Sequence, residues 1–326
     1  MMKKAAFTIT GYIITIVLIS SLLAKLDVHA IWADLMKARW PYIVAAAALN
    51  MLVIVLKTVR WQWLMRPAKK SKYLRLFNAT MIGLAANNVL PARGGDWLKI
   101  YLLGKWEDVN KAMLASITAL DKLFEGFSIL ILFGFLSFHS TFPEWVQRGT
   151  LIITIVMVIG LAICLLLMQH HRRSTNGDNG DNGEPGRFSR LLANLGSGMQ
   201  ILSKKRMLAL NLVLSVVICL LQIETIRLCQ IAFGLHLDLW IPALIFVAIN
   251  LAIVIPSAPS GVGPFEVAAV LAYSWIGINA ETAFSIAICY HAVQFAPVTV
   301  IGAVIYLKTL GLKGPAEVAK AEATEG

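Results

Sequence analysis

Charged side chains are scarce in this 326-residue sequence. Asp, Glu, Lys and Arg make up 14% of it and hydrophobic residues 58%, whereas an average soluble domain is about 25% charged. Acids are the scarcer sign, with 18 Asp and Glu against 29 Lys and Arg, and no acid lies between Leu35 and Gly95. This composition predicts an integral membrane protein and argues against a water-soluble enzyme. The net charge of +11 then indicates membrane topology and anionic lipid, with no nucleic acid as partner.

Motifs of paired or metal-binding cysteines and motifs of catalytic residues are also lacking. The four cysteines lie in apolar runs without a CxxC pair or a His/Cys ligand spacing, which argues against disulfides and a zinc site. There is no nucleophile elbow and no phosphate-binding loop, and the loops lack the paired carboxylates that would hold a divalent cation. The sequence therefore predicts no catalytic residue, no metal and no cofactor. An enzyme whose site is hidden among intramembrane residues stays open as an alternative.

Long hydrophobic runs are abundant instead. A helix needs roughly 20 apolar residues to cross a bilayer, and six segments qualify: 5–24, 41–59, 112–138, 150–168, 207–233 and 282–307. The first could be a signal peptide, but its apolar run is long and residues 20–24 match a cleavage site poorly. We expect it to be an uncleaved transmembrane helix.

Two further apolar regions, 77–106 and 240–277, are interrupted. Proline and glycine cluster at 91–95 and at 256–264, where they end one helix and let another begin. Asp96 and Glu266 open the second arms, where an acid meets the positive end of the helix dipole. The predicted fold is an all-α polytopic membrane protein. It has six full transmembrane helices plus two broken, re-entrant helical hairpins, or eight spans if the hairpins cross fully.

Basic residues predict the orientation. They cluster before the first span and after the second, fourth and last spans, whereas the opposite loops hold four. By the positive-inside rule, both termini and the 60–76 and 170–206 loops are cytoplasmic, in the plasma (inner) membrane. The cluster from Lys57 to Arg75 is expected to be a solvated loop that attracts anionic lipids. The first broken region then opens to the cytoplasm and the second to the outside.

The chain is expected to form two halves. Residues 1–170 contain the first broken helix, 207–310 contain the second, and 171–206 form a basic cytoplasmic loop with a flexible linker at 174–186. Residues 311–326 form a cytoplasmic tail. Matching breaks of opposite orientation are typical of inverted-repeat transporters, whose substrate site lies where the breaks meet. Kinked helices without a transport role remain an alternative.

Three motifs carry a family resemblance. The stretch Asn88-x-Leu-Pro-Ala-Arg-x-Gly-Asp-x-x-Lys-x-Tyr-Leu-Leu and the later Pro-Ser-x-Pro-Ser-Gly-x-Gly-x-x-Glu resemble signatures of the lysylphosphatidylglycerol synthetase/flippase transmembrane family. Residues 120–125 resemble a variant of its Arg-Leu-Leu-Asp motif. The resemblance covers about 5–310 and implies a flippase-like helical fold that moves a polar-headed lipid between leaflets. Bifunctional members carry a soluble aminoacyltransferase domain after the last span, whereas residues 308–326 follow it in this sequence, so the resemblance is not expected to extend to aminoacyl transfer.

Charges within the spans are the candidate site residues, because each costs about 2.5–3.5 kcal/mol at mid-bilayer. The third span carries a polar stripe with Lys122 and Glu125 at i,i+3, and the guanidinium of Arg93 suits a phosphate at the first break. Local structural pairing is the alternative. The predicted substrate-binding residues are Arg93, Asp96, Lys122, Glu125, Glu224, Arg227 and Glu266. Asp121 lacks a local partner once Lys122 pairs with Glu125, and it is the candidate for proton coupling.

The function predicted from these residues is lipid translocation, passive or ion-coupled. The expected partners are membrane lipids with anionic headgroups, and a homo-oligomer is left open. Two other classes remain as alternatives: a membrane-embedded lipid-modifying enzyme and a non-transporting assembly or regulatory subunit.

Overall fold

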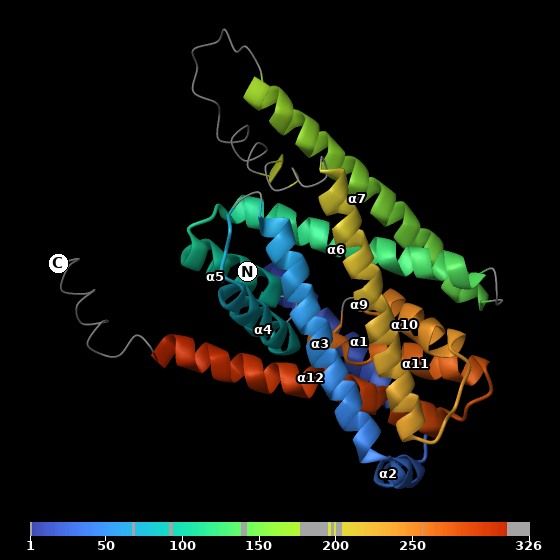
Figure 1. Cartoon of the computed structure of the whole chain (residues 1–326). Helices are drawn as coiled ribbons and strands as arrows, with labels where there is room; N and C mark the ends of the chain where they lie inside the picture. The colour runs from blue at the N-terminus through green and yellow to red at the C-terminus, as the bar shows by residue number, and fades with distance from the viewer. Residues whose placement is uncertain are drawn as a thin grey trace.

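The computed structural model describes residues 2–66, 69–90, 94–137, 142–176, 195–196, 199, 204–255 and 257–311, which form helices joined by turns and short loops. No strand occurs in these ranges, so the all-α prediction is confirmed (Figure 1). The helices are α1 (Met2–Leu23), α2 (Val28–Lys37), α3 (Trp40–Met65), α4 (Tyr73–Val89), α5 (Gly94–Glu107), α6 (Lys111–Ser137), α7 (Glu144–Asn176), α9 (Lys205–Ala232), α10 (Trp240–Ala252), the 3-10 turn η3 (Pro259–Gly261), α11 (Pro264–Trp275) and α12 (Ala280–Gly311). Of the predicted linker, residues 177–186 lie outside the described ranges, as do residues 312–326 of the predicted tail.

Within the described part of the chain, four helices are long and apolar enough to cross a bilayer: α3, α9, residues Glu144–Gln169 of α7 and residues Ala280–Thr309 of α12. A fifth span results if α1 and α2, which meet at an angle of 88°, are counted together. Helix α6 has 27 residues but carries Asp121, Lys122 and Glu125 in its interior. All six predicted full spans correspond to helices in the structure.

Both interrupted regions form pairs of short helices. The arms α4 and α5 have 17 and 14 residues, and α10 and α11 have 13 and 12. At 1.5 Å per residue the longest arm measures about 25 Å, less than the roughly 30 Å of a hydrocarbon core. Each pair therefore has the dimensions of a re-entrant hairpin, with its break where proline and glycine predicted it.

Close backbone contact holds the first hairpin together. A Cβ atom at Gly95 would lie only 2.6 Å from the backbone nitrogen of Asn87, so only glycine allows α5 to approach α4 this closely. The Asn87 side chain joins the arms, because its Oδ1 accepts the Gly95 N–H at 2.8 Å and its Nδ2 donates to Asp96 Oδ1 at 3.0 Å.

Side chains from two helices hold the second break. Gly263 has a φ of +97°, and its N–H donates to Glu266 Oε2 at 2.7 Å. Thr15 of α1 bridges the break, since its hydroxyl accepts the Ala258 N–H and donates to the Val262 carbonyl, each at 2.9 Å. These bonds satisfy backbone groups that the interrupted helix leaves free.

The two hairpins open toward opposite ends of α9. At the open end of the first hairpin, Arg75 donates to the Trp106 carbonyl at 3.2 Å, and this hairpin packs in the same core as Leu208 near the start of α9. At the open end of the second, Trp240 and Trp275 pack with ring centroids 6.4 Å apart. Gln230, near the end of α9, donates to the Tyr273 hydroxyl at 3.0 Å. This opposite arrangement agrees with the orientation that the basic residues predict.

Helix α12 passes close to both hairpins and carries a proline. Pro297 has no N–H, so the Val293 carbonyl lacks its usual helical donor. Asn50 of α3 replaces that donor, with its Nδ2 3.2 Å from the Val293 oxygen. The bond lets α12 continue through the proline while packing against α3 and α4.

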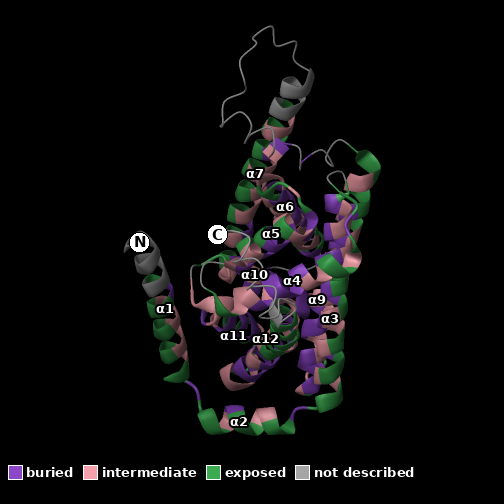
Figure 2. Ribbon diagram, turned by 90° about the vertical axis from the view of Figure 1, so that its left-hand side faces the viewer, coloured by how far each residue is buried: buried purple, intermediate pink, exposed green. Residues whose placement is uncertain are grey.

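Helix α2 is an element that the sequence analysis missed. It lies across the end of the bundle between α1 and α3, and α1 stands to one side (Figure 2). Asp27 caps α2 by accepting the His29 N–H at 2.8 Å, and Asp34 Oδ2 accepts the Thr282 hydroxyl of α12 at 2.7 Å. Helix α2 exposes the apolar side chains of Trp32 and Met36 as well as polar ones such as His29. This combination suits a helix that lies at a membrane surface.

Candidate functional site

Five charged side chains meet where α3, α6 and α9 pack. This ionic cluster consists of Lys57 and Arg60 of α3 with Asp121, Lys122 and Glu125 of α6. Arg60 is fully buried and lies at its centre. Its Nε donates to Asp121 Oδ1 at 2.8 Å, its Nη2 donates to Glu125 Oε1 at 3.0 Å, and its Nη1 donates to Ser215 Oγ of α9 at 2.9 Å. One guanidinium therefore connects three helices.

Glu125 is surrounded by cations. Lys57 Nζ lies 3.0 Å from its Oε1 and Lys122 Nζ lies 3.2 Å from its Oε2, in addition to Arg60. Three cations and two carboxylates give the cluster a formal charge of +1. The Lys122 side chain is 44% exposed, whereas that of Glu125 is 24% exposed. The cluster thus has a buried centre and an accessible, positively charged edge.

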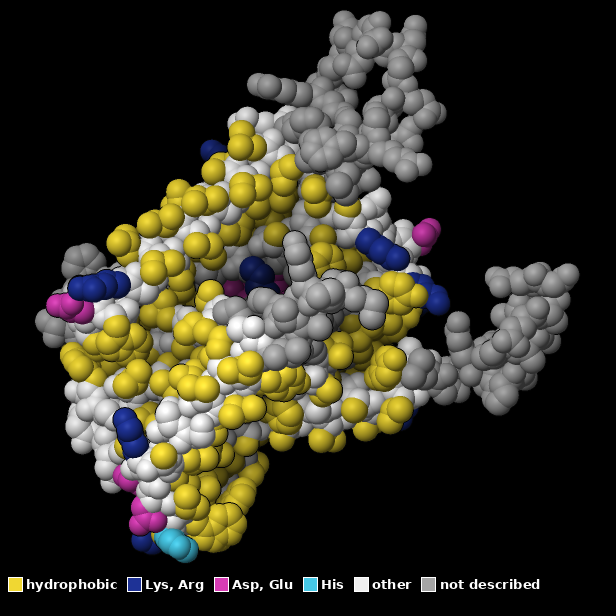
Figure 3. All heavy atoms as spheres, turned by 180° about the vertical axis from the view of Figure 1, so that it is seen from behind, with side chains coloured by type: hydrophobic (Ala, Val, Ile, Leu, Met, Phe, Trp, Pro, Cys, Tyr) yellow, Lys and Arg dark blue, Asp and Glu magenta, His cyan; other side chains and the backbone are white. Residues whose placement is uncertain are grey.

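A small polar cavity adjoins the ionic cluster. Its volume is about 50 Å³, which is room for a few water molecules. Besides Lys57, Arg60 and Glu125, it is lined by Gln222 of α9 and by Asn250 of α10. The cavity therefore lies between the two halves of the chain. Figure 3 shows a hollow in a largely hydrophobic face, with basic and acidic side chains at its bottom.

The prediction for Lys57 and Arg60 was wrong. The basic cluster that begins at Lys57 was expected to be a solvated loop at the end of the 41–59 span, but α3 continues to Met65, and both side chains bind acids of α6. Asp121 therefore has a partner, 61 residues away in sequence, that no spacing within its own helix could indicate. The predicted Lys122–Glu125 pair is present.

A second polar network joins the tips of the hairpins. Asn88, at the end of α4, donates from Nδ2 to Thr299 Oγ1 of α12 at 2.8 Å, and its Oδ1 lies 3.4 Å from Ser260 Oγ in the second break. Ser260 Oγ is also 3.0 Å from His291 Nε2, and His291 Nδ1 is 2.6 Å from Glu266 Oε1. The end of α4 and the second break therefore meet, and they do so beside the middle of α12.

A comparison with known families fits this architecture. A family model for the lysylphosphatidylglycerol synthase TM region matches residues 8–302. The chain belongs to this family. The match includes both hairpins and the ionic cluster, and it makes the protein an integral, multi-pass membrane protein. The resemblance in the motifs is confirmed.

Relatives within the family are distant in sequence but similar in extent. A UPF0104 membrane protein of Methanothermobacter thermautotrophicus is 22% identical over 311 residues, which are 89% of this chain and 92% of the relative. A UPF0104 membrane protein of Methanocaldococcus jannaschii is 22% identical over 227 residues, which are 68% of this chain and 92% of the relative.

The other predicted site residues that are described lie outside the ionic cluster. Asp96 binds Asn87 inside the first hairpin, and Glu266 belongs to the tip network. Glu224 and Arg227 form a two-bond pair on α9, with distances of 2.6 and 2.7 Å. Arg93 lies outside the described residues. Among the described residues, no group of three or more His, Cys, Asp or Glu side chains is placed to hold a metal ion.

Besides Lys57 and Arg60, sequence reasoning missed four polar partners: Ser215 in the ionic cluster, and Thr299, Asn88 and Ser260 in the tip network. The last two stand inside the family-like motifs, which was the available signal. Ser215 and Thr299 are hydroxyl residues within apolar spans, with no motif around them to indicate a partner.

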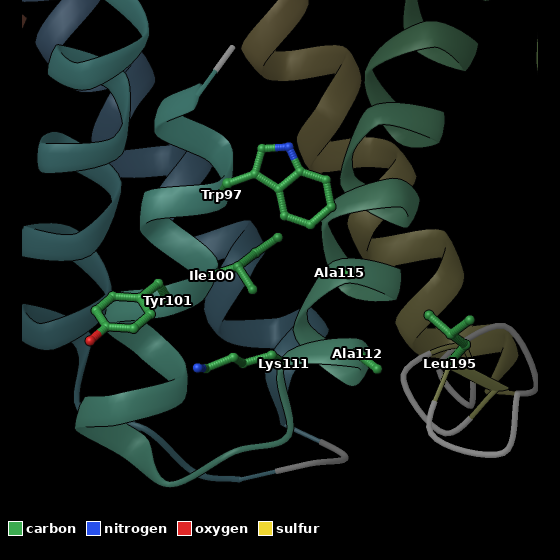
Figure 4. Close-up of a pocket in the computed structure, with 7 residues that line it drawn as sticks. All are labelled: Trp97, Ile100, Tyr101, Lys111, Ala112, Ala115 and Leu195. Carbon is green, nitrogen blue, oxygen red and sulfur yellow. The ribbon is translucent and has the colours of Figure 1, made fainter. Parts of the chain in front are cut away.

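An apolar pocket of about 380 Å³ lies between the first hairpin and α6 (Figure 4). Trp97, Ile100 and Tyr101 of α5 form one wall, and Lys111 and the alanines at 112 and 115 of α6 form another, with Leu195 at its edge. Lys111 Nζ lies 4.8 Å from the centre of the Tyr101 ring. The pocket has the size of a small-molecule site and a cation at its border.

Proposed function

We propose that this protein moves a lipid with a polar headgroup, anionic or aminoacylated, between the two leaflets, with no covalent change to the lipid. We place it in the plasma (inner) membrane with both termini in the cytoplasm. The observation that carries the proposal is the ionic cluster, whose Lys122 edge is accessible within a helical bundle that exposes many large hydrophobic side chains.

The cost of the charges supports a functional role. Each ionisable side chain within a span costs about 2.5–3.5 kcal/mol on insertion scales, and five meet here. Lys122 is the most exposed cation of the cluster and already shares Glu125 with Lys57 and Arg60. A lipid phosphate can therefore bind Lys122 while Glu125 remains paired with Lys57 and Arg60.

The hairpins support an inverted-repeat transporter. Asp96 and Glu266 occupy the third positions of α5 and α11. Glu266 accepts the N–H of Gly263 in the break that precedes it, and Asp96 accepts from Asn87 near the end of the preceding arm, α4. The hairpins open toward opposite ends, and their tips meet through Asn88 and Ser260. Transporters built this way bind substrate between the two repeats and expose it to each side in turn.

The apolar pocket offers a place for part of an acyl chain. Ala115 in the pocket and Lys122 in the ionic cluster are seven residues apart on α6, which is about 10 Å along a helix. We infer that one lipid can extend its chain toward Trp97 and its headgroup toward Lys122. Lipids with a negative phosphate are then preferred over uncharged lipids.

The test uses purified protein in liposomes that contain fluorescently labelled phosphatidylglycerol, its lysyl ester or an uncharged diacylglycerol in separate preparations. Leaflet exchange is followed by quenching the outer leaflet. The protein should accelerate exchange of the first two lipids, and Lys122→Gln should slow it by about tenfold, equivalent to about 1.4 kcal/mol. Arg148→Gln is the matched control, because Arg148 forms an exposed pair with Glu144 at the start of α7.

Two results would contradict the proposal. One is exchange no faster than in protein-free liposomes at several lipid compositions. The other is a change in the mass of the lipids after incubation, which would favour a lipid-modifying enzyme instead.

A further inference from the structure

The tip network contains a hydroxyl group that cannot satisfy both of its neighbours at once. Ser260 Oγ lies 3.0 Å from His291 Nε2 and 3.4 Å from Asn88 Oδ1. A serine hydroxyl has a single hydrogen to donate. The Asn88 amide is oriented by its Nδ2, which donates to Thr299 Oγ1, so the side of Asn88 that faces Ser260 is an acceptor.

Glu266 determines which nitrogen of His291 carries hydrogen in the neutral ring. Its Oε2 accepts the Gly263 N–H, and its Oε1 lies 2.6 Å from His291 Nδ1. A carboxylate accepts, so Nδ1 carries the hydrogen and neutral Nε2 has only a lone pair. The Ser260 hydrogen then points to Nε2, and Asn88 Oδ1 receives none.

Addition of a proton to Nε2 reverses this arrangement. The Nε2–H now donates to Ser260 Oγ, and the serine hydrogen is released to donate to Asn88 Oδ1. A continuous set of hydrogen bonds then runs from Glu266 through His291 and Ser260 to Asn88. That set joins the tip of the second hairpin to the tip of the first.

We propose that His291 binds a proton that connects the two hairpin tips, and that this proton couples lipid movement to pH. The coupling rests on the proposed translocase function, whereas the connection between the tips does not. Asp121 is less suited to this task, because its carboxylate is held by the buried guanidinium of Arg60.

The surroundings leave His291 with one charged neighbour. Among the described ion pairs, His291 takes part only in that with Glu266. Phe265 stacks on the imidazole at 4.3 Å, and Phe295 meets it edge-on at 6.4 Å. Charged groups of the other elements packed against α12 have partners of their own: Asp34 of α2 binds Thr282, Lys57 and Arg60 of α3 bind the acids of α6, Arg75 of α4 binds Glu107, and Glu224 and Arg227 of α9 bind each other.

The first experiment measures the tips without any lipid transport. Spin labels are attached through Val89→Cys, beside Asn88, and Val254→Cys, at the end of the α10 arm; both positions are exposed, and the four native cysteines are buried. Distances are recorded at about pH 5.5 and about pH 8, on either side of the range in which imidazole normally titrates. The distribution should be narrow at the lower pH and broader at the higher.

Three variants identify the groups responsible. His291→Gln should remove the pH response, because the ring that gains the proton is absent. Ser260→Ala should also remove it while leaving the His291–Glu266 contact in place. His236→Gln is the matched control, since His236 lies exposed in the loop before α10, and it should respond as the unaltered protein does. A response that survives in His291→Gln, or is absent from the unaltered protein, overturns the proposal.

The second experiment applies a pH gradient across the liposomes used for lipid exchange. The unaltered protein and His236→Gln should change their exchange rate by about fivefold or more, within the usual range of coupling between two sites. The rate of His291→Gln should not respond. If the lipid exchange rate does not change with the pH gradient while the distance between the spin labels responds to pH, the coupling is overturned but the translocase function is not. Absence of any exchange overturns the translocase, and the distance measurement still decides the role of His291.

Discussion

Replacement of Arg60 by methionine is expected to destabilise the protein through one specific carboxylate. Methionine is similar in length and can occupy the fully buried site without a charge. Glu125 would keep Lys57 and Lys122, and Ser215 would keep its hydrogen bond to the Asn211 carbonyl. Asp121 would lose Arg60, the one partner it has among the described ion pairs.

The magnitude follows from that loss. Breaking a buried ion pair by removing one partner costs about 3–5 kcal/mol. Asp121→Asn keeps an acceptor for Arg60 at 2.8 Å and should cost about 1–2 kcal/mol. The double variant Arg60→Met/Asp121→Asn removes the unpaired charge as well, so it should be more stable than the sum of the single effects by about 2 kcal/mol.

The assay is the thermal unfolding midpoint of purified protein in detergent. A chain of this size shifts by about 2 °C per kcal/mol. Arg60→Met should therefore unfold about 6–10 °C lower, and the double variant should recover about 4 °C of the additive loss. Arg148→Met, at an exposed pair, should shift the midpoint by less than about 2 °C. Strictly additive losses, or an Arg60→Met midpoint within 2 °C of the unaltered protein, would refute the reasoning.

Three further predictions concern the helical framework. Gly95→Ala should lower the unfolding midpoint sharply, because the added Cβ has no space between the arms of the first hairpin. Gly134→Ala should leave the midpoint unchanged, because no atom lies within 4 Å of a Cβ at that position. Equal effects of the two substitutions would contradict the prediction. Asn50→Ala should lower the free energy of unfolding by about 1–3 kcal/mol. The loss should be much smaller in a chain that also carries Pro297→Ala, because alanine restores the missing N–H donor to the Val293 carbonyl. If the unfolding midpoints of the four proteins show no coupling between the two positions, the assigned bond is contradicted. Thr15→Val should destabilise the second break by about 1–3 kcal/mol, and Thr15→Ser should not; urea or thermal midpoints that fall equally would show that the hydroxyl is dispensable.

The hairpins could be predicted from sequence because their signals are local. Proline and glycine stop a helix wherever they cluster, and the two breaks occur where they do. The acids that follow them also occupy the expected first turns. Nothing in a local pattern required Asn88 and Ser260 to meet, however, because that contact joins residues 172 positions apart.

The ionic cluster could be predicted only by half. Spacing along α6 identified Asp121, Lys122 and Glu125, but their partner Arg60 was assigned to a loop because α3 was expected to end at residue 59. A basic residue near a predicted span end has two physical outcomes, solvation or burial with an acid, and only the packing of α3 on α6 decides between them. Helix α2 was missed because ten residues are too few to form a stable helix without the contacts to α12.

The clasp that Thr15 forms across the second break has a consequence for biogenesis. Its partners Ala258 and Val262 come 243 and 247 residues later in the chain. At about 5–20 residues per second, the ribosome needs roughly 12–50 s to supply them. For that interval the Thr15 hydroxyl lacks both of its partners across the break. The first helix to be synthesised therefore completes its contacts among the last, and release of the chain before residue 258 leaves Thr15 without either partner.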